Sequence, residues 1–569
     1  MQPANPPDPS SYPFNLGPFT RKINTTSPAA QIWFSRGLTW VYTFNHAEAA
    51  ACFGKAIAHD PNCAIAHWGL AYALGPNYNF AWEFFGEDLA DAVKRTHEAA
   101  QRAKELASSN SVSATPVERA LIAALQARFP SAEVASGMEV YASRNAAYAD
   151  AMEEVYGAFG SDDLDVAALY ADSLMSLTPW KLWDLKTGLP NPGTRTLDAK
   201  RVLENALNQK WTEATRHPGI LHYYIHLVEM SSTPELGLVP ADHLRDLVPD
   251  SGHANHMPSH LDVLVGDYRA AIAANTRATI ADEKYLAHTG ALNFYSNYRL
   301  HNYHTLIYAA TLAGQKRVAL ATVERMEATL PSELLVSMAD FVEVFVSVRP
   351  HVMVRFGMWE EIKGLDVPGD PELYCVTTAA VYYAKGIAYA ATGDIAEAES
   401  HRQLYADAVK RVPDTRLDFP NKCVDILGVG AAMLDGEIAY RKGEYAAAFA
   451  SLRRAVELDD GLGYSEPWSW MQPARHAYAA LLLEQGHVAE AAAVYKEDLG
   501  LDSSVIRARR HYNNVWALHG YHECLVRLGK VDEAAVIEPQ LTLALAVADV
   551  KVESSCFCRR EVGGENACC

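Results

Sequence analysis

Long apolar runs and an excess of basic residues are both missing from this sequence. No segment approaches the roughly 18 to 20 consecutive apolar residues that a membrane-spanning helix needs. The 69 acidic residues outnumber the 49 basic ones and give a formal charge of −20, which repels phosphate backbones and anionic lipid head groups. We therefore expect neither nucleic acid nor a membrane surface as a partner.

A secretory signal and a disulfide framework are also lacking. The opening MQPANPPDPSSYPFNLG has neither the basic start nor the apolar middle of a signal peptide. Nine cysteines are an odd number for a set of structural disulfides. Five are dispersed and four lie at the end of the chain, as Cys556, Cys558, Cys568 and Cys569. We expect a soluble cytoplasmic protein whose terminal cysteines either form part of a flexible tail or bind a soft metal.

The common catalytic and nucleotide-binding motifs are absent. The sequence has no Gly-rich phosphate loop, no GxSxG motif, no Ser/His/Asp order and no stripe of alternating basic and aromatic residues. Its 49% hydrophobic and 21% charged residues indicate a folded chain with a large core. At 569 residues, the chain is either several domains or one extended repeat array.

A recurring helical pattern favours the repeat array. In WFSRGLTWVYTFNHAEAAACFGKAIAHDP, small residues at Gly37, Ala49 and Ala56 fall where two antiparallel helices must touch. This spacing resembles a tetratricopeptide repeat (TPR), a helix–turn–helix unit of about 34 residues. Related turns recur at Gly266, Gly314, Gly393, Gly443, Gly486 and Gly529. Glycine permits the left-handed turn and alanine permits the close helix approach.

The resemblance implies an all-α, TPR-like α-solenoid, a right-handed superhelix of antiparallel helix pairs. We expect an extended N-terminal arm over residues 1–28, lying over the first helices or left loose. The solenoid is expected over residues 29–549, with a possible insertion at 110–200 folded across the groove, and residues 550–569 form a tail.

Several motifs are more specific than the general repeat. They are similar to those of a subgroup of TPR proteins found in bacteria and fungi. The residues that carry this resemblance are FNHAEA (44–49), AHWGLAYALGPNYN (66–79), SLTPWKLW (176–183), HPGILHYYIHLVE (217–229), GHANHMPSHL (252–261) and LHNYH (300–304). The resemblance implies the fold and hands over no activity.

Histidines gather in the segment from His217 to His304, which holds ten of the chain's 21. His222, His226 and Glu229 are spaced i, i+4 and i+7, so they fall within about 60° of one helix face. Pro218 suits the first turn of that helix. A pair of histidines at i, i+4 is how helices often present two ligands to a metal.

The next histidines come from GHANHMPSH and from LHNYH. Because Pro258 disfavours helix at the residue before it, we expect a helix to begin near Pro258. This prediction leaves His253 and His256 on a loop, with His260 one turn into the helix. His301 and His304 are spaced i, i+3 and share another face.

Two interpretations of the cluster stay open: a metal or catalytic site, and a hydrogen-bonded polar core. For a metal, imidazole ligation suits zinc, copper or iron. The predicted ligands are His222, His226, His256 and His260, with His46 and His67 as weaker candidates. Plausible supporting side chains are Asn255, Asn302, Tyr223 and Tyr303. Trp180, Trp183, Tyr78 and Trp82 are candidates to line a groove for a ring-bearing ligand.

Two functions of different classes follow. In the first, the chain is a metal-dependent enzyme, an oxidoreductase or hydrolase acting on a small organic molecule. Glu229 is then a fifth ligand or general base, and His253, His301 and His304 are acid–base or supporting groups. In the second, the chain is a non-catalytic TPR scaffold that binds a peptide or partner protein on its concave face.

Overall fold

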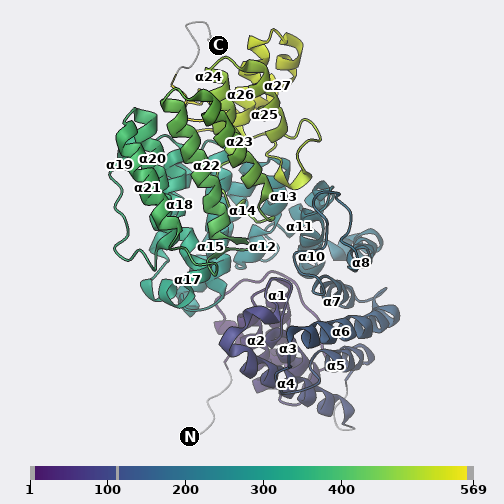
Figure 1. The fold of residues 1–569 in the computed structure, drawn as a ribbon. Coiled ribbons are helices and arrows are strands. Elements are labelled where there is room, and N and C mark those ends of the chain that lie inside the picture. The colour runs from purple at the N-terminus through teal and green to yellow at the C-terminus, as the bar shows by residue number, and fades with distance from the viewer. Residues whose placement is uncertain (1–6, 110–113, 561–569) are drawn as a thin grey trace. The chain divides into compact units, whose positions relative to one another are not determined.

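The computed structural model describes residues 7–109 and 114–560, and these residues are almost entirely helical. The chain divides into two compact units, residues 1–261 (unit 1) and 262–569 (unit 2), with the boundary inside helix α13. Figure 1 labels the helices along the chain. Each unit is built from antiparallel helix pairs. The predicted all-α, TPR-like array of helix pairs is confirmed.

Unit 1 contains the helices that hold most of the predicted site. They are α1 (Pro28–Tyr42), α2 (His46–His59), α3 (Ala64–Leu74), α4 (Leu89–Ser108), α5 (Pro116–Arg128), α6 (Met138–Phe159), α7 (Leu164–Met175), α8 (Thr196–Gln209), α9 (Trp211–Ala214), α10 (Pro218–Glu229), α11 (Leu238–Leu244) and α12 (Gly252–His256), together with the first residues of α13 (Pro258–Val265). Short 3₁₀ turns lie at Pro9–Ser11, Trp82–Phe84, Gly86–Asp88 and Pro234–Gly237. Helix pairs α1/α2, α3/α4, α5/α6 and α7/α8 pack side by side.

Unit 2 is also built largely from helical hairpins. Its helices are α14 (Tyr268–Thr289), α15 (Tyr295–Leu312), α16 (Lys316–Ala328), α17 (Ser332–Val346), α18 (Val348–Arg355), α19 (Trp359–Lys363), α20 (Cys375–Thr392), α21 (Ile395–Val409), α22 (Cys423–Arg441), α23 (Tyr445–Gly461), α24 (Ala474–Glu484), α25 (Val488–Asp498), α26 (Val515–Arg527) and α27 (Val531–Val547). A 3₁₀ turn lies at Arg507–Arg509. Strands β1 (Leu417–Asp418) and β2 (Asn421–Lys422) form a small antiparallel ladder that pairs Leu417 with Lys422.

The turns between paired helices use glycine as predicted. Gly393 ends α20 with a φ of 96° and Gly443 follows α22 with a φ of 81°. Both angles lie in the left-handed region that side chains with a Cβ rarely adopt. The other four predicted turn glycines, Gly266, Gly314, Gly486 and Gly529, also have positive φ. The hairpins therefore reverse where the repeat pattern placed their turns.

Close helix contact in the first hairpin depends on missing side chains. A Cβ on Gly37 of α1 would lie 2.8 Å from the ring of Phe53 on α2, and one on Gly69 of α3 would lie 2.5 Å from it. Ala49 and Ala56 on α2 are fully buried. The three helices therefore pack around one phenylalanine, and the predicted small residues lie at the contact.

The described part of the N-terminal arm lies over the first helices, one of the two predicted possibilities. Its Phe14, Leu16 and Ile23 are buried. Arg21 forms ion pairs of 2.8 Å with Asp163 and 2.5 Å with Asp165 at the start of α7. Both carboxylates belong to unit 1, so the arm is tied to the unit by buried charge pairs.

The region in which an insertion was predicted is mostly helical. Helices α5, α6 and α7 occupy most of residues 116–175, and the longest stretch without a helix among the described residues of this region is 176–195. Trp183 in this loop is buried and donates from Nε1 to the carbonyl of Leu227 on α10, at 2.6 Å. The loop at 176–195 therefore packs against the helix that carries His222 and His226.

Five of the seven cysteines within the described residues are buried and free. Cys52, Cys63, Cys375, Cys423 and Cys524 are reduced and buried. Within the described residues, one disulfide joins Cys556 to Cys558, a pairing that the sequence did not predict. Cys568 and Cys569 lie outside the described residues. Across residues 7–109 and 114–560, no helix combines the length and apolar character needed to cross a bilayer.

Candidate metal centre

Helix α10 presents His222 and His226 as the spacing predicted. Pro218 occupies its first turn, and the Nδ1 of His217 caps it by accepting a hydrogen bond from the amide of Ile220 at 3.2 Å. Every residue of α10 is buried. The helix is therefore a core element, and both imidazoles are taken out of water.

His253 and His256 lie on a helix, and the prediction that they lie on a loop is wrong. Ser251 caps the short helix α12 by accepting from the amide of Ala254 at 3.3 Å. Met257 keeps a right-handed helical conformation despite the proline that follows it. Helix α13 begins at Pro258 as predicted. The cap at Ser251 therefore starts a helical turn before the proline, which fixes the directions of both histidines.

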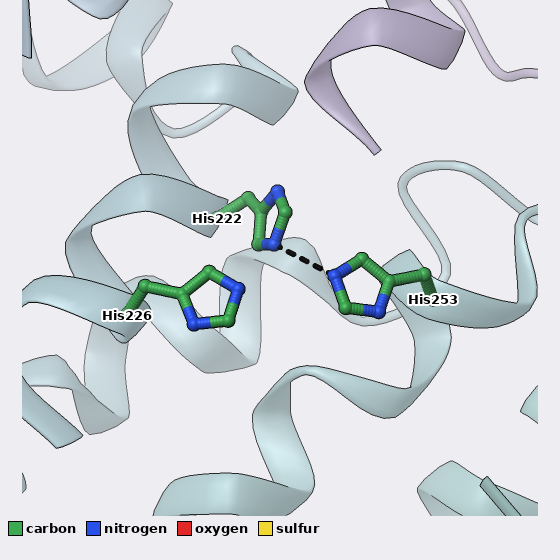
Figure 2. A group of neighbouring side chains, drawn as sticks. All are labelled: His222, His226 and His253. Atoms are coloured by element: carbon green, nitrogen blue, oxygen red, sulfur yellow. Dashed lines mark hydrogen bonds between the residues drawn. The ribbon is translucent and has the colours of Figure 1, made fainter. Parts of the chain in front are cut away.

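Three imidazoles from α10 and α12 meet in one place. His222, His226 and His253 point toward one another (Figure 2). Their ring centroids are 4.7, 4.8 and 5.9 Å apart. One ligand nitrogen from each lies within 4.8 Å of the other two. We call these residues the histidine triad, and each is at most 2% exposed.

The hydrogen bonds of the triad orient its nitrogens. The Nδ1 of His222 lies 2.6 Å from the carbonyl oxygen of Tyr42. A carbonyl oxygen only accepts, so Nδ1 carries the proton and the Nε2 of His222 keeps its lone pair. That Nε2 lies 3.1 Å from the Nε2 of His253. The Nδ1 of His226 lies 2.9 Å from Oε1 of Glu229, and its Nε2 is buried without a hydrogen-bond partner.

Glu229 contacts His226 and His260, and its carboxylate lies within 4.8 Å of a ligand nitrogen of each, so these three residues are a second group that could hold a metal ion. One carboxylate oxygen accepts from Nδ1 of His226, and the other accepts from Nδ1 of His260. Metal-binding histidines commonly donate their second N–H to a carboxylate, which fixes the ring and raises its basicity. The predicted fifth ligand or general base is thus placed as a positioning group for two histidines.

His260 and His256 form a second pair next to the triad. Their Nε2 atoms are 2.6 Å apart, and the ring of His260 is 5.7 Å from that of His226. The hydroxyl of Ser259 lies 3.4 Å from Nδ1 of His256. The four predicted metal ligands therefore lie in one buried region of unit 1, but His253 replaces His256 and His260 in the triad.

Burial keeps the imidazoles of His222 and His226 neutral. Loss of water lowers the pKa of His226 to about 3. The pKa of His222 is also well below its usual value, because burial acts together with repulsion from His226 and His256. A neutral imidazole is the form that binds a metal ion. At neutral pH, His222 and His226 consequently offer lone pairs without first having to release protons.

Aromatic rings close the triad from several sides. Phe44 lies in the turn between α1 and α2. Its ring centroid is 4.6 Å from that of His222 and 5.6 Å from those of His226 and His253. Its φ of 56° is unusual for a residue with a side chain and aims the ring at the triad. Tyr78 and Trp180 lie 5.2 and 6.4 Å from His226. These two residues of the predicted ring-binding groove therefore cover the site.

Phe44 and the carbonyl of Tyr42 were missed by sequence reasoning as parts of the site. The FNHAEA motif was the available signal, because it contains Phe44 and begins two residues after Tyr42. Their contacts with α10 join residues about 180 positions apart. No local periodicity reports a contact of that range.

The weaker candidates lie apart from the triad. His46 begins α2 beside Phe44, at 6.5 Å between rings, and burial lowers its pKa to about 4. Its Nδ1 is buried without a hydrogen-bond partner. His67 on α3 contacts the carbonyl of Pro61 through Nε2 at 3.1 Å. His46 therefore belongs to the surroundings of the triad, whereas His67 is a residue of the α2–α3 connection.

His301 and His304 lie on α15 of unit 2. His304 lines an internal cavity of about 20 Å³ that His351 also lines. Burial lowers the pKa of His304 to about 3 and that of His351 to about 4. In unit 2, His304 is thus a buried, neutral residue beside a cavity that can hold about one water molecule.

Known proteins offer limited guidance to this chain. No family model and no curated protein sequence matches it. Among solved structures, the APC/C hetero-tetramer Cut9–Hcn1 is similar with 13% identity and a TM-score of 0.29, covering 84% of this chain and 74% of that one.

Two further solved structures are similar over most of the chain. Naa15/Naa10 bound to HypK-THB has 14% identity and a TM-score of 0.20, covering 91% of this chain and 70% of that one. Ypp1 has 11% identity and a TM-score of 0.32, and the match covers 96% of this chain and 69% of that one. Likeness at this level supports no argument about the site. The TPR-like fold rests on the chain's own helix pairs.

Proposed function

We propose that this helical-repeat protein binds a transition metal ion at His222, His226 and His253. The buried Nε2 of His226, which has no hydrogen-bond partner, carries the proposal. It faces two other imidazoles, and a buried polar nitrogen left unpaired costs about 1 to 3 kcal/mol. An ion bound by all three rings satisfies it.

The separation of the nitrogens is compatible with a shared ion. Two nitrogens at about 2.1 Å from one tetrahedral zinc lie roughly 3.4 Å apart. The Nε2 atoms of His222 and His253 are 3.1 Å apart. A ligand nitrogen of His226 lies within 4.8 Å of one on each of these two residues, so binding by all three rings requires the nitrogens to come no more than about 1.4 Å closer.

The donor set narrows the choice of metal. Three neutral imidazoles suit zinc and copper. A non-haem iron centre commonly uses two histidines and a carboxylate, but Glu229 already accepts from two Nδ1 atoms. Zinc and copper are therefore favoured over iron.

A hydrogen-bonded histidine network is the competing explanation. The Nε2–H of His253 can donate to the Nε2 of His222, and this needs no metal. That arrangement leaves the Nε2 of His226 without a donor. The hydrogen-bonded network alone therefore accounts for the Nε2 atoms of His222 and His253 but not for that of His226.

Metal-dependent oxidation or hydrolysis of a small organic molecule stays a prediction. Three imidazoles leave a coordination position for water or substrate, as catalytic zinc sites do. However, the three rings are at most 2% exposed, so a substrate needs a movement of the covering side chains. In the described conformation, a structural metal ion that takes part in no reaction is a simpler role for this site than catalysis.

Docking of a peptide or partner protein is the second candidate function. Helical-repeat arrays commonly use the row of first helices for this purpose. In unit 2, helices α20, α22, α24 and α26 are the first helices of four successive pairs. A non-catalytic scaffold that holds a metal ion in the core of unit 1 is compatible both with the histidine triad and with the row of first helices in unit 2.

Elemental analysis tests the metal proposal directly. Protein purified without a histidine tag and loaded with zinc or Cu(I) should retain about one ion per chain after dialysis. His226→Ala should abolish retention, and His351→Ala, which removes a buried histidine of unit 2, should not. Retention by folded His226→Ala, or none by wild type, rules out the triad as the binding site.

A further inference from the structure

The end of the described chain lies inside unit 2 as an extended segment. Residues 551–560 contain no helix or strand, yet Ser555 is fully buried and Cys558 and Arg559 are 2% and 5% exposed. We call residues 551–560 the C-terminal segment. Such burial is unusual for a segment without regular secondary structure, because such segments commonly run over the protein surface.

The C-terminal segment crosses the row of first helices. It contacts α20 through the carbonyls of Ala390 and Ala391, α22 through Arg441, α24 through His476 and α26 through Glu523. All four helices open their hairpins. A single strand of chain therefore follows the face that a repeat array presents to extended peptides.

Two arginines of unit 2 bind the backbone of the segment. Arg355 donates to the carbonyl of Ser555, and Arg441 donates to the carbonyl of Cys558. Contacts with backbone carbonyls do not depend on the side chains of the bound peptide. Burial lowers the pKa of Arg355 to about 9, and its guanidinium stacks on Trp516 at 4.1 Å. It is thus held in place independently of the segment.

One carboxylate and one backbone carbonyl of unit 2 contact the side chains of Arg559 and Arg560 at the end of the segment. Glu523 accepts two hydrogen bonds from Arg559, at 2.7 and 2.8 Å, in the two-pronged geometry that suits guanidinium. Glu484 accepts from the amide of Arg560 at 2.7 Å. The side chain of Arg560 donates to the carbonyl of Ala391 at 2.8 Å. These contacts select a basic pair at a fixed distance from the backbone anchors.

At the first backbone anchor, Ser555, the surroundings fit a small hydroxyl side chain. The hydroxyl of Ser555 donates to the carbonyl of His476 at 2.7 Å and lies 2.6 Å from the hydroxyl of Tyr495. Phe557 packs near Trp516, at 6.0 Å between rings, while 37% of it stays exposed. The side chains of the segment that unit 2 contacts most specifically are therefore those of Ser555 and, four and five residues later, Arg559 and Arg560.

We propose that this groove of unit 2 is a binding site for an extended partner peptide carrying a serine and an arginine pair at this spacing. The chain's own C-terminal segment occupies the groove and competes with the partner. The proposal rests on the docking role and does not depend on a metal in unit 1. The groove's carboxylates and carbonyl-binding arginines match such a peptide in charge and in hydrogen bonding.

The competition should be strong because the segment is tethered. A tethered ligand has an effective concentration in the millimolar range for short flexible linkers. A free peptide of the same sequence must exceed this concentration to replace it. Weakening the tethered copy should consequently raise the apparent affinity for a free peptide.

The probe is a fluorescein-labelled synthetic peptide with the sequence of residues 550–560 and its two cysteines joined. Anisotropy titration of full-length protein should show weak binding to wild type. Arg559→Glu in the full chain should tighten binding by at least about tenfold, because the tethered segment then meets Glu523 with like charge. Arg454→Glu makes the same charge change at an exposed position of α23 and should bind as wild type does.

A charge reversal makes the test specific for the groove. Adding Glu523→Arg to Arg559→Glu should restore the ion pair in cis and return the probe to weak binding. If the folded Arg559→Glu chain binds no more tightly than Arg454→Glu, the segment is a fixed part of the fold and the proposal is overturned. Should Arg559→Glu misfold, the milder pair Arg559→Ala/Arg560→Ala replaces it.

The outcome also separates this proposal from the docking role in general. If partners bind unit 2 at another place, the probe should bind none of the variants. That result contradicts the proposed groove but does not contradict the proposal that unit 2 docks a partner. His226→Ala serves as a second control, because loss of the triad should leave the probe affinity unchanged.

Discussion

At Glu229, one carboxylate sets the proton positions of two histidines. Its oxygens accept from Nδ1 of His226 and Nδ1 of His260, so both rings keep their Nε2 lone pairs. Glu229 itself is 1% exposed. The chemistry of the triad therefore depends on a residue that need not touch the ion.

Glu229→Gln should weaken metal binding by about 10- to 100-fold. The amide NH₂ of glutamine cannot accept, so one histidine must move its proton to Nε2 and lose a ligand lone pair. Competition titration against a zinc chelator measures the change. Unaltered affinity in a folded variant contradicts the positioning role.

Asp282 is a buried acid with an unusual pKa. Burial raises its pKa to about 7, although Asn302 donates to it at 2.7 Å and Tyr295 at 3.0 Å. The unfolded chain titrates near pH 3.9. Between these values the folded state binds more protons than the unfolded state, so this group makes the protein less stable as the pH rises from about 4 to 7.

Asp282→Asn should remove that part of the pH dependence. The free energy of unfolding of wild type minus that of the variant should fall between pH 4.5 and pH 7.5, by on the order of 1 kcal/mol per unit of pKa shift. Urea denaturation at several pH values measures it. Asp162→Asn, at a position whose side chain is 94% exposed, should give a flat difference. A flat difference for Asp282→Asn contradicts the raised pKa.

At the scale of single helices, α22 contains glycines with opposite surroundings. A Cβ on Gly436 would lie 2.6 Å from Leu452 of α23, whereas one on Gly428 would meet no atom within 4 Å. Both positions are helical. The first glycine permits close packing of the hairpin, and the second only adds flexibility to the unfolded chain.

Alanine at these two positions should act in opposite directions. Gly428→Ala should stabilise unit 2 by about 0.5 to 1 kcal/mol because alanine favours helix. Gly436→Ala should destabilise it by about 1 to 3 kcal/mol through overpacking against Leu452. Thermal unfolding of the two variants measures the difference. The same sign for both contradicts the described α22/α23 packing.

The elements could be predicted well because their signals are local. Gly393 and Gly443 mark turns by a backbone angle that glycine alone adopts freely, and His222 and His226 share a face through simple helical spacing. The error at His253 arose from weighing Pro258 without the cap at Ser251. The pairing of Tyr42 with His222, and that of Ser555 with Arg355, join distant parts of the chain, and nothing in the local pattern reports them.

For the whole molecule, the two compact units divide the proposed functions between them. The histidine triad lies in unit 1, and the groove that holds the C-terminal segment lies in unit 2. A ligand that binds only the folded state stabilises what it contacts, by about 2.7 kcal/mol at 100 times its dissociation constant. Each ligand should therefore stabilise mainly the unit to which it binds.

Hydrogen exchange of the full chain should show this division. Added zinc should slow amide exchange in α10 and α12, whose histidines form the triad. Peptides from α22 to α26 should keep their exchange rates. Mass spectrometry of proteolytic fragments measures both regions at once, with His226→Ala as the control. Slowing confined to unit 2 places the ion elsewhere.

The carbonyl of Tyr42 and the ring of His222 are 180 positions apart, and Arg21 reaches its carboxylates across more than 140. On a ribosome, the arm and the first hairpin emerge long before the partners that hold them in place. Domains generally fold as units during synthesis. Unit 1 cannot complete its triad until His253 has left the exit tunnel, so any ion must arrive after most of this unit has been made.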